Sequence, residues 1–155
     1  ETIATGLQNA KWPARLQRLK QGPLIDLLPD DAELFVDGGH NIAAAEVIAN
    51  WLAHSHPARQ TVAVMGMLDN RDPVAFLRPL APYISGLAAV TIPGEHQAHA
   101  PQTLCDAATT LNIPATACSS ATHAIETLRD TFPEARRFLI LGSLYLAGNI
   151  LAENN

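Results

Sequence analysis

Three short polar segments carry most of the side chains in this sequence that could do chemistry, and each follows a run of apolar residues. They are Asp37-Gly38-Gly39-His40-Asn41, Asp69-Asn70-Arg71-Asp72 and Gly142-Ser143. If the apolar runs are parallel strands, the three segments lie at the carboxyl edge of one sheet, where α/β domains bind their ligands. The spacing therefore predicts a ligand site built from three loops.

The first segment offers a carboxylate, a pair of glycines and an imidazole within five residues. Glycines let backbone N–H groups approach a ligand closely, and a helix that begins after Asn41 directs its positive end to the same place, which favours anions. Asp37 can then bond a ribose or hold a metal-bound water, and His40 can stabilise a phosphate. The alternative is that Asp37 closes a turn and His40 lies on the surface.

Arg71 and Ser143 are the candidate anion-binding residues of the other two segments. Arg71 can bind a carboxylate or a phosphate. The alternative is a solvated surface cluster of Asp69, Arg71 and Asp72, in which Asp72 caps the next helix. Ser143 either binds an anion at a helix N-terminus or is an ordinary helix cap. The Gly-x-Ser-x-Gly pattern of a nucleophile elbow is absent, so we do not expect Ser143 to be a nucleophile.

A metal site is a weaker hypothesis. His96 and His99 are spaced like two metal ligands but lack an evident third one. Together with His40 they would suit a metal-dependent hydrolase, which predicts stoichiometric zinc. The cysteines, Cys105 and Cys118, are expected to be buried small apolar residues.

Short apolar runs alternate with helical periods along the chain. Strands are expected at residues 34–36, 61–67, 87–92, 115–118 and 138–141, and helices after Asn41, from Pro73 to about 81, from Pro101 to about 111, after Ser119 or Ser120, and after Ser143. Residues 16–19 and 24–28, around a Gly-Pro turn, predict a hairpin or lead-in strand. This alternation predicts an α/β fold with a parallel sheet and helices on both faces.

Composition narrows the function classes. The chain has 155 residues, 48% hydrophobic and 16% charged, with a net charge of −5. This suits one domain with its own core and no nucleic-acid partner. The most apolar stretch, residues 138–152, is too short and too polar to span a membrane, and two cysteines make no disulfide framework, which favours a cytoplasmic setting.

The sequence lacks a phosphate-binding loop of its own. Its only lysines are Lys11 and Lys20, and neither follows a glycine-rich loop, so a Walker-type motif is excluded within these residues. Because the chain begins at Glu1 rather than at Met, we expect either a processed protein or one domain of a longer polypeptide.

Four segments, taken in order, resemble the motifs of folylpolyglutamate synthases. Residues 12–17 (WPARLQ) resemble WPGRLQ, residues 35–41 (FVDGGHN) resemble LLDGAHNP, residues 65–72 (MGMLDNRD) resemble G-x-x-x-D-K-D, and residues 141–148 (LGSLYLAG) resemble GSLYLAG. Each motif alone is modest, but together they cover almost the whole chain.

The resemblance implies the C-terminal domain of a folylpolyglutamate synthase, in bacteria often a bifunctional dihydrofolate synthase, within the Mur ligase superfamily. The implied fold is a three-layer, Rossmann-like domain with a mostly parallel sheet. In this family a central ATPase domain holds the phosphate loop, ATP and Mg²⁺. ATP phosphorylates a carboxylate of dihydropteroate or a folate, and L-glutamate attacks the acyl phosphate. The C-terminal domain closes over the ATPase domain, contacts ATP and provides much of the glutamate site.

The same resemblance implies a division of the chain and a role for each matching residue. Residues 1–15 would be an interdomain hinge arm and residues 16–155 the ligase domain, with the ATPase domain outside these residues and the whole protein a monomer. Arg15, Asp37 and His40 would contact ATP, with His40 also needed for turnover. Arg71 and Ser143 would lie beside the glutamate, and no residue here would be a metal ligand.

The chain also departs from the family pattern. Ala14, Gly39 and Ile42 replace glycine, alanine and proline, and Asn70-Arg71 replaces Asp-Lys. Arginine keeps the charge of lysine but changes its geometry. An alternative hypothesis of a different class is a freestanding Rossmann-like module, which would bind a nucleotide or an amino acid tightly by itself.

Overall fold

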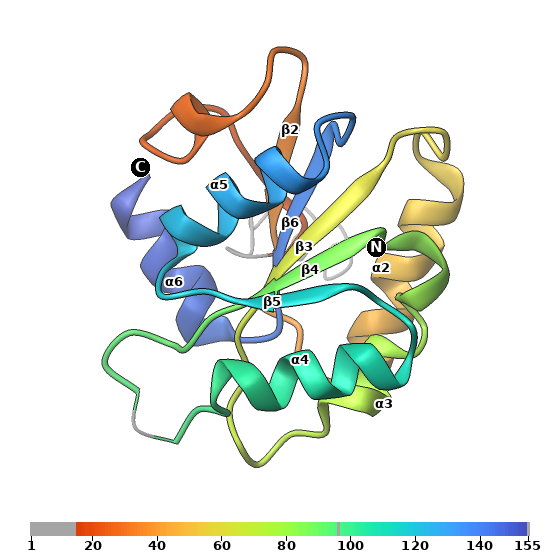
Figure 1. Cartoon of the computed structure of the whole chain (residues 1–155), viewed down its shortest axis with the longest axis vertical. Helices are drawn as coiled ribbons and strands as arrows, with labels where there is room; N and C mark the ends of the chain where they lie inside the picture. The colour runs from red at the N-terminus through yellow and green to blue at the C-terminus, as the bar shows by residue number, and fades with distance from the viewer. Residues whose placement is uncertain (1–14, 96, 155) are drawn as a thin grey trace, which may run out of the picture.

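The computed structural model describes residues 15–95 and 97–154 (Figure 1). These residues form a six-stranded sheet in the order β1-β2-β6-β3-β4-β5. Strand β1 is antiparallel to β2, and all the other neighbours are parallel. The strands are Gln17–Leu19 (β1), Glu33–Val36 (β2), Thr61–Met65 (β3), Gly86–Ala89 (β4), Ala115–Ala117 (β5) and Arg137–Leu141 (β6).

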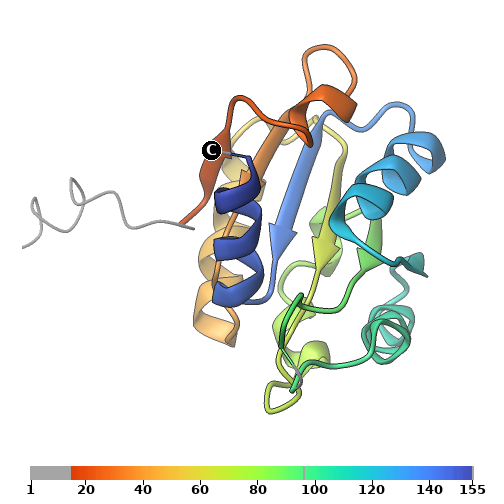
Figure 2. The same ribbon diagram turned by 90° about the vertical axis from the view of Figure 1, so that its left-hand side faces the viewer.

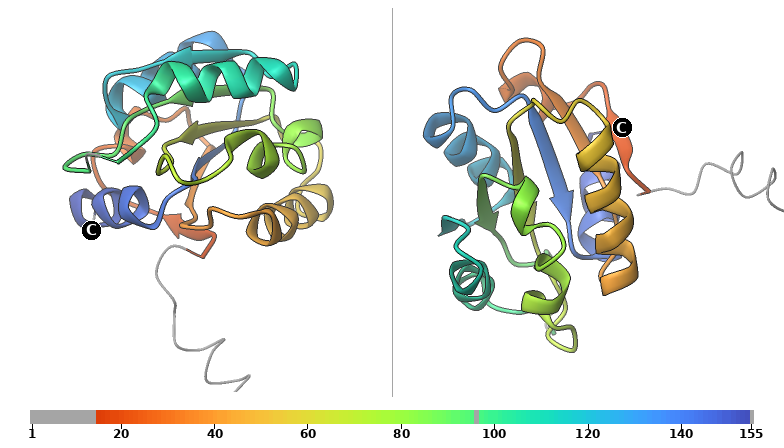
Figure 3. Two further views of the ribbon diagram at one scale, coloured as in Figure 1. Left: turned by 90° about the horizontal axis from the view of Figure 1, so that it is seen from below. Right: turned by 90° about the vertical axis from the view of Figure 1, so that its right-hand side faces the viewer.

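Helices cover both faces of the sheet. One face is covered by α5 and α6, which lie in front of the strands in Figure 2. The opposite face, seen on the right of Figure 3, is covered by α2, α3 and α4. The helices are Ile42–His54 (α2), Pro73–Leu77 (α3), Pro101–Thr110 (α4), Ala121–Thr131 (α5) and Leu144–Glu153 (α6), with short 3₁₀ turns at Ile25–Leu27 (η1) and Ala81–Tyr83 (η2). The α/β fold and mostly parallel sheet expected from the sequence are therefore confirmed.

Two separate hydrophobic cores result, one on each face of the sheet. The central strands β3 and β6 are buried along their whole length because helices pack on both of their sides. Among the described residues no helix is long and apolar enough to cross a bilayer.

The helix starts follow the local signals in the sequence. Asn41, Asp72, Ser120 and Ser143 each accept hydrogen bonds from backbone N–H groups in the first turn of α2, α3, α5 and α6. Pro101 occupies the first turn of α4, where a missing N–H costs nothing.

Three expected boundaries and one expected strand were wrong. Helix α3 ends at Leu77 rather than near Ala81, because Pro79 has no N–H to donate the next helical hydrogen bond, and the chain then forms η2. Strands β3 and β4 end at Met65 and Ala89, two or three residues earlier than expected. Residues 24–28 contain the 3₁₀ turn η1 and its two caps rather than a strand, so only β1 fulfils the lead-in prediction.

Candidate ligand site at the carboxyl edge of the sheet

The three polar loops that follow β2, β3 and β6 meet at one edge of the sheet, at the point where the connections to the next helices leave toward opposite faces. Strand β6 lies between β2 and β3, although it is the last strand in the sequence. The chain leaves β6 toward α6 on one face, but it leaves β2 and β3 toward α2 and α3 on the other. Loops that diverge in this way open a crevice at the carboxyl edge of a parallel sheet.

Asp37 secures the first loop rather than facing the crevice. Its side chain is only 6% exposed. Oδ1 accepts a hydrogen bond from the Gly39 N–H at 2.7 Å, and Oδ2 accepts one from the Leu16 N–H at 2.9 Å. Leu16 has a φ of +45°, a left-handed conformation that is unfavourable for a residue with a side chain. Asp37 thus joins the segment before β1 to the loop after β2.

His40 is the residue of the first loop that reaches the crevice. It is half-buried, and its Nδ1 is buried without a hydrogen-bond partner among the described residues. Asn41 does not compete for a ligand, because its Oδ1 accepts from the Ala44 N–H at 2.9 Å as the cap of α2. An unpartnered ring nitrogen beside a helix N-terminus is suited to a polar ligand.

In the second loop, Asp72 has a structural role, whereas the neighbouring Arg71 side chain is available for a ligand. The Asp72 carboxylate caps α3 by accepting from the Val74 and Ala75 N–H groups. Arg71 is exposed, and within residues 15–95 and 97–154 its guanidinium makes no ion pair. Its backbone carbonyl accepts a hydrogen bond from His99 Nε2 at 2.8 Å, which fixes the loop and leaves the Arg71 side chain available.

The third loop depends on Gly142. Its φ is +103°, and a Cβ at this position would collide with the Gly66 carbonyl oxygen at the end of β3. This close approach places Ser143 at the start of α6, where its Oγ accepts from the Tyr145 and Leu146 N–H groups. Ser143 is therefore a helix cap, and its hydroxyl hydrogen remains free for a ligand.

His40, Arg71 and Ser143 line one cavity of about 240 Å³. A hollow of about 450 Å³ adjoins it, and His40 and Arg71 contribute to both. Asp37 lines neither hollow, and Arg15 is exposed at the start of the described chain, next to the Leu16 N–H that Asp37 holds. Of the five residues proposed from the sequence, the fold brings three to one cavity, uses Asp37 to hold the first loop, and leaves Arg15 exposed outside both hollows.

A comparison of the sequence with known protein families identifies the domain. Residues 15–144 match the family described as "Mur ligase, glutamate ligase domain". The chain belongs to this family. The match spans every strand of the sheet and ends within the first turn of α6.

Folylpolyglutamate synthases are among the relatives of this glutamate ligase domain. It is 29% identical over 85 residues to the human mitochondrial folylpolyglutamate synthase, which is 50% of this chain and 13% of that protein. It is also 29% identical over 82 residues to a dihydrofolate synthase/folylpolyglutamate synthase of Mycobacterium tuberculosis, which is 53% of this chain and 15% of that protein. The resemblance seen in the four motifs is thereby confirmed.

A solved structure gives the same result. A crystallised folylpolyglutamate synthase of Mycobacterium tuberculosis, complexed with ADP and AMPPCP, superposes with a TM-score of 0.74 at 27% identity. The match covers 90% of this chain and 31% of that one. The chain therefore spans about a third of the crystallised relative, and smaller parts of the two curated ones.

Apolar residues at the rim of the cavity were not anticipated from the sequence. Leu144 and Tyr145 line the cavity and are 62% and 59% exposed, and Ile42 lines the adjoining hollow. The available signal was a bulky apolar pair in the first turn of a helix, directly after a capping serine. The sequence does not show what would cover Leu144 and Tyr145, so from the sequence alone they look like core residues of α6.

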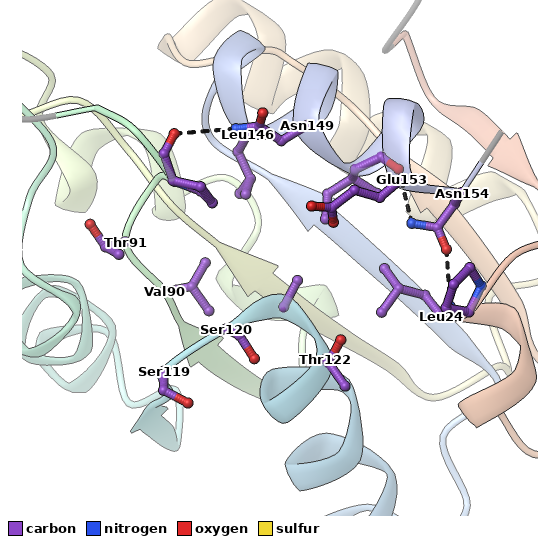
Figure 4. A pocket seen from close by; sticks show the side chains of 14 residues that line it. Leu24, Val90, Thr91, Ser119, Ser120, Thr122, Leu146, Asn149, Glu153 and Asn154 are labelled. Carbon is purple, nitrogen blue, oxygen red and sulfur yellow. Dashed lines mark hydrogen bonds between the residues drawn. The ribbon is translucent and has the colours of Figure 1, made fainter.

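Another hollow of the glutamate ligase domain, of about 280 Å³, lies between α5 and α6 (Figure 4). Its floor is apolar, with Leu24, Val90 and Leu146, and its rim carries the hydroxyls of Ser119 and other residues. Glu153 is the one charged residue that lines it in the described part of the chain. Because it offers no cation, this hollow does not suit an anionic ligand.

The zinc hypothesis gains no support from the described residues, in which no group of three or more His, Cys, Asp or Glu side chains could hold a metal ion. The His99 ring is engaged with the Arg71 carbonyl, and His96 lies outside the described residues, as does most of the expected hinge arm. Both cysteines are free and buried, as expected.

Proposed function

We propose that this domain is the glutamate-binding lid of an ATP-dependent ligase that adds L-glutamate to dihydropteroate or folates through an acyl phosphate. The observation that carries the proposal is the meeting of His40, Arg71 and Ser143 on one cavity at the carboxyl edge. Membership in the glutamate ligase domain family and similarity to folylpolyglutamate synthases support the choice of reaction.

The cavity has the chemistry that a dicarboxylate and a phosphate require. The Arg71 guanidinium, which has no counter-ion among the described residues, can form a paired contact with a glutamate carboxylate. Ser143 presents a hydroxyl hydrogen at the positive end of α6. His40 lines the same cavity, and its Nδ1, buried and without a hydrogen-bond partner among the described residues, would gain one from a phosphate bound in the closed site.

In this proposal Asp37 and Arg15 act on the ATP side of the domain. Arg15 is exposed beside Leu16, so its guanidinium can reach a nucleotide held by another domain. Asp37 keeps that segment next to the His40 loop through its two backbone hydrogen bonds. Both Asp37 oxygens are occupied, and this carboxylate does not fit a Mg²⁺ site; the ATPase domain would hold the metal.

The exposed apolar rim suits a domain that closes on a partner. Leu144, Tyr145 and Ile42 surround the site and would be buried when an ATPase domain covers it. Closure of this kind keeps water from an acyl phosphate, which hydrolysis would destroy. The partner is thus the ATPase domain of the same polypeptide, in a monomeric, cytoplasmic enzyme.

The proposal is tested by assaying the 155-residue chain without the rest of the ligase. The 155-residue chain alone, mixed with MgATP, glutamate and dihydropteroate, should release no ADP, and calorimetry should detect at most weak binding of ATP or glutamate. Robust turnover by the chain alone would overturn the proposal, and tight binding of either ligand would favour the freestanding module instead.

The complete polypeptide provides the complementary test. Its sequence upstream of Glu1 should contain a phosphate loop of the GxxGKGS type. In that polypeptide, His40→Ala should reduce kcat by roughly 100-fold, the range of lost acid–base or charge-stabilising groups. Asp130→Ala changes an exposed side chain of α5 outside both hollows and should leave kcat unchanged. Equal rates in the wild type and His40→Ala would refute the role of His40.

A further inference from the structure

A fourth cavity lies at the opposite, amino edge of the sheet, away from the proposed ligase site. It has a volume of about 290 Å³. Its polar lining comes from Arg59, Gln60, Thr61, Tyr83, Ser85 and Arg137. Two of these residues are arginines, and no acidic residue lines the cavity in the described part of the chain. This composition is unusual for a protein whose net charge is −5.

Arg137 is the central group, because it is a charged side chain held inside the protein. It is 2% exposed, at the first position of β6. Its Nε donates to Thr61 Oγ1 at 2.9 Å, its Nη1 donates to the Ser55 carbonyl, and its guanidinium carbon lies 5.0 Å from the Trp51 ring centroid. These contacts fix the orientation of the guanidinium, but all of them are to uncharged groups.

No carboxylate neutralises this guanidinium. Within the described residues Arg137 makes no ion pair, and its Nη2 has no hydrogen-bond partner. The acid on the neighbouring strand, Glu33, is already paired with Arg18 at 3.3 Å and with Arg59 at 3.1 Å. Three arginines therefore surround a single glutamate at this edge. Buried charges are ordinarily paired, so the arrangement lacks an anion.

The electrostatics of the group agree with this geometry. Burial lowers the pKa of Arg137; Glu33 opposes this effect and the positive charge of Arg59 adds to it. An arginine nevertheless stays protonated in proteins. A bound anion would relieve the unfavourable burial of its charge.

We infer that the cavity at the amino edge is a binding site for a phosphate group, either free or on a small phosphomonoester, held between Arg137 and Arg59. A phosphate matches two guanidinium groups better than a single carboxylate does, because it has enough oxygens to accept from both arginines at once, from Nη2 of Arg137 and from the N–H groups of Arg59 other than Nη1, which already donates to Glu33. Ser85 and Tyr83 would add hydroxyl donors from the other wall of the cavity. This site is separate from the proposed ligase site and does not depend on it.

Titration of the ¹⁵N-labelled 155-residue chain with sodium phosphate, at constant ionic strength, tests the inference by NMR. The Arg137 Nε–Hε resonance and the amide of Ser85 should shift and saturate, with a Kd on the order of 1 mM. Glycerol 3-phosphate binding more tightly than phosphate would identify a phosphomonoester as the ligand, and the reverse order would identify free phosphate. Acetate should cause no saturating shift; equal binding of acetate would overturn the choice of phosphate.

Two variants keep the test decisive even if Arg137→Leu fails to fold. Arg59→Gln removes the second cation from a half-buried position and should weaken phosphate binding about tenfold. Arg129→Gln removes the same charge from α5, outside the cavity, and should leave the Kd within about twofold. Linear shifts that never saturate, or an equal loss in both variants, would overturn the site. Saturating shifts confined to the His40, Arg71 and Ser143 loops would do so too.

Discussion

At the scale of single residues, Asp37 is more important for holding the site together than its motif suggests. Its two carboxylate oxygens accept from the Leu16 and Gly39 N–H groups, which lie 21 and two positions away in the sequence. A pattern of residue types can identify the aspartate, but it does not reveal that one partner is a backbone group before β1. Asp37 can therefore close a turn, as one alternative held, and still contribute to the ligand site by holding its loop in place.

Asp37→Ala is expected to lower the free energy of unfolding by about 1–3 kcal/mol, because two partly buried N–H groups would lose their acceptor. Urea unfolding of the isolated chain measures this cost without any substrate. Asp69→Ala removes an exposed carboxylate with no hydrogen bond in the described part of the chain and should change the stability by less than about 0.5 kcal/mol. Equal stabilities of the two variants would show that Asp37 does not support the loops.

At the scale of elements, the site depends on how closely the ends of β3 and β6 approach each other. Gly66 N–H donates to the Leu141 carbonyl at 3.3 Å, and the chain then turns at Gly142 into α6. The positive φ of Gly142 and the Gly66 carbonyl beside it both require a residue without a Cβ. The sequence signals the cap at Ser143 but not this contact between strands.

Gly142→Ala should therefore destabilise the domain by about 2 kcal/mol or more, since backbone strain and a collision with backbone add together. Gly148→Ala is the matched control within α6, because a Cβ there meets nothing within 4 Å. That change should stabilise the helix by up to about 1 kcal/mol. Thermal unfolding of both variants measures the difference, and a neutral Gly142→Ala would contradict the proposed close approach.

At the scale of the whole molecule, two cores share one sheet, and each contains one cysteine. Cys105 lies in the core under α2–α4, and Cys118 lies in the core under α5 and α6. Since β3 and β6 contribute side chains to both cores, we expect the cores to unfold together. Burial raises the pKa of the Cys105 thiol, and the nearby Asp106 raises it further, so this thiol is also chemically unreactive in the folded state.

Alkylation of the two thiols across a urea gradient should therefore follow a single transition with the same midpoint for both cysteines. Circular dichroism on the same samples gives the midpoint of global unfolding for comparison. Labelling of Cys118 well before Cys105 would show that the edge strand β5 and helix α5 open separately from the rest of the sheet.

The sequence by itself determined the local structure and the family, and it supplied the candidate site residues. Alternating apolar runs, helix-starting prolines and caps such as Asn41 and Ser143 are local signals, and they located nearly every element. The four motifs also led to the correct family. Boundaries such as the end of α3 were less certain, because they depend on a single competing residue, Pro79.

Only the tertiary structure decided which of these residues meet. Strand β6 inserts between β2 and β3, and so Ser143 reaches His40 from about 100 positions away in the sequence. The same insertion buries the Arg137 guanidinium against Thr61 and Trp51, beside a glutamate, Glu33, that already pairs with Arg18 and Arg59. Strand order depends on packing between distant segments, and no local pattern of residues encodes it.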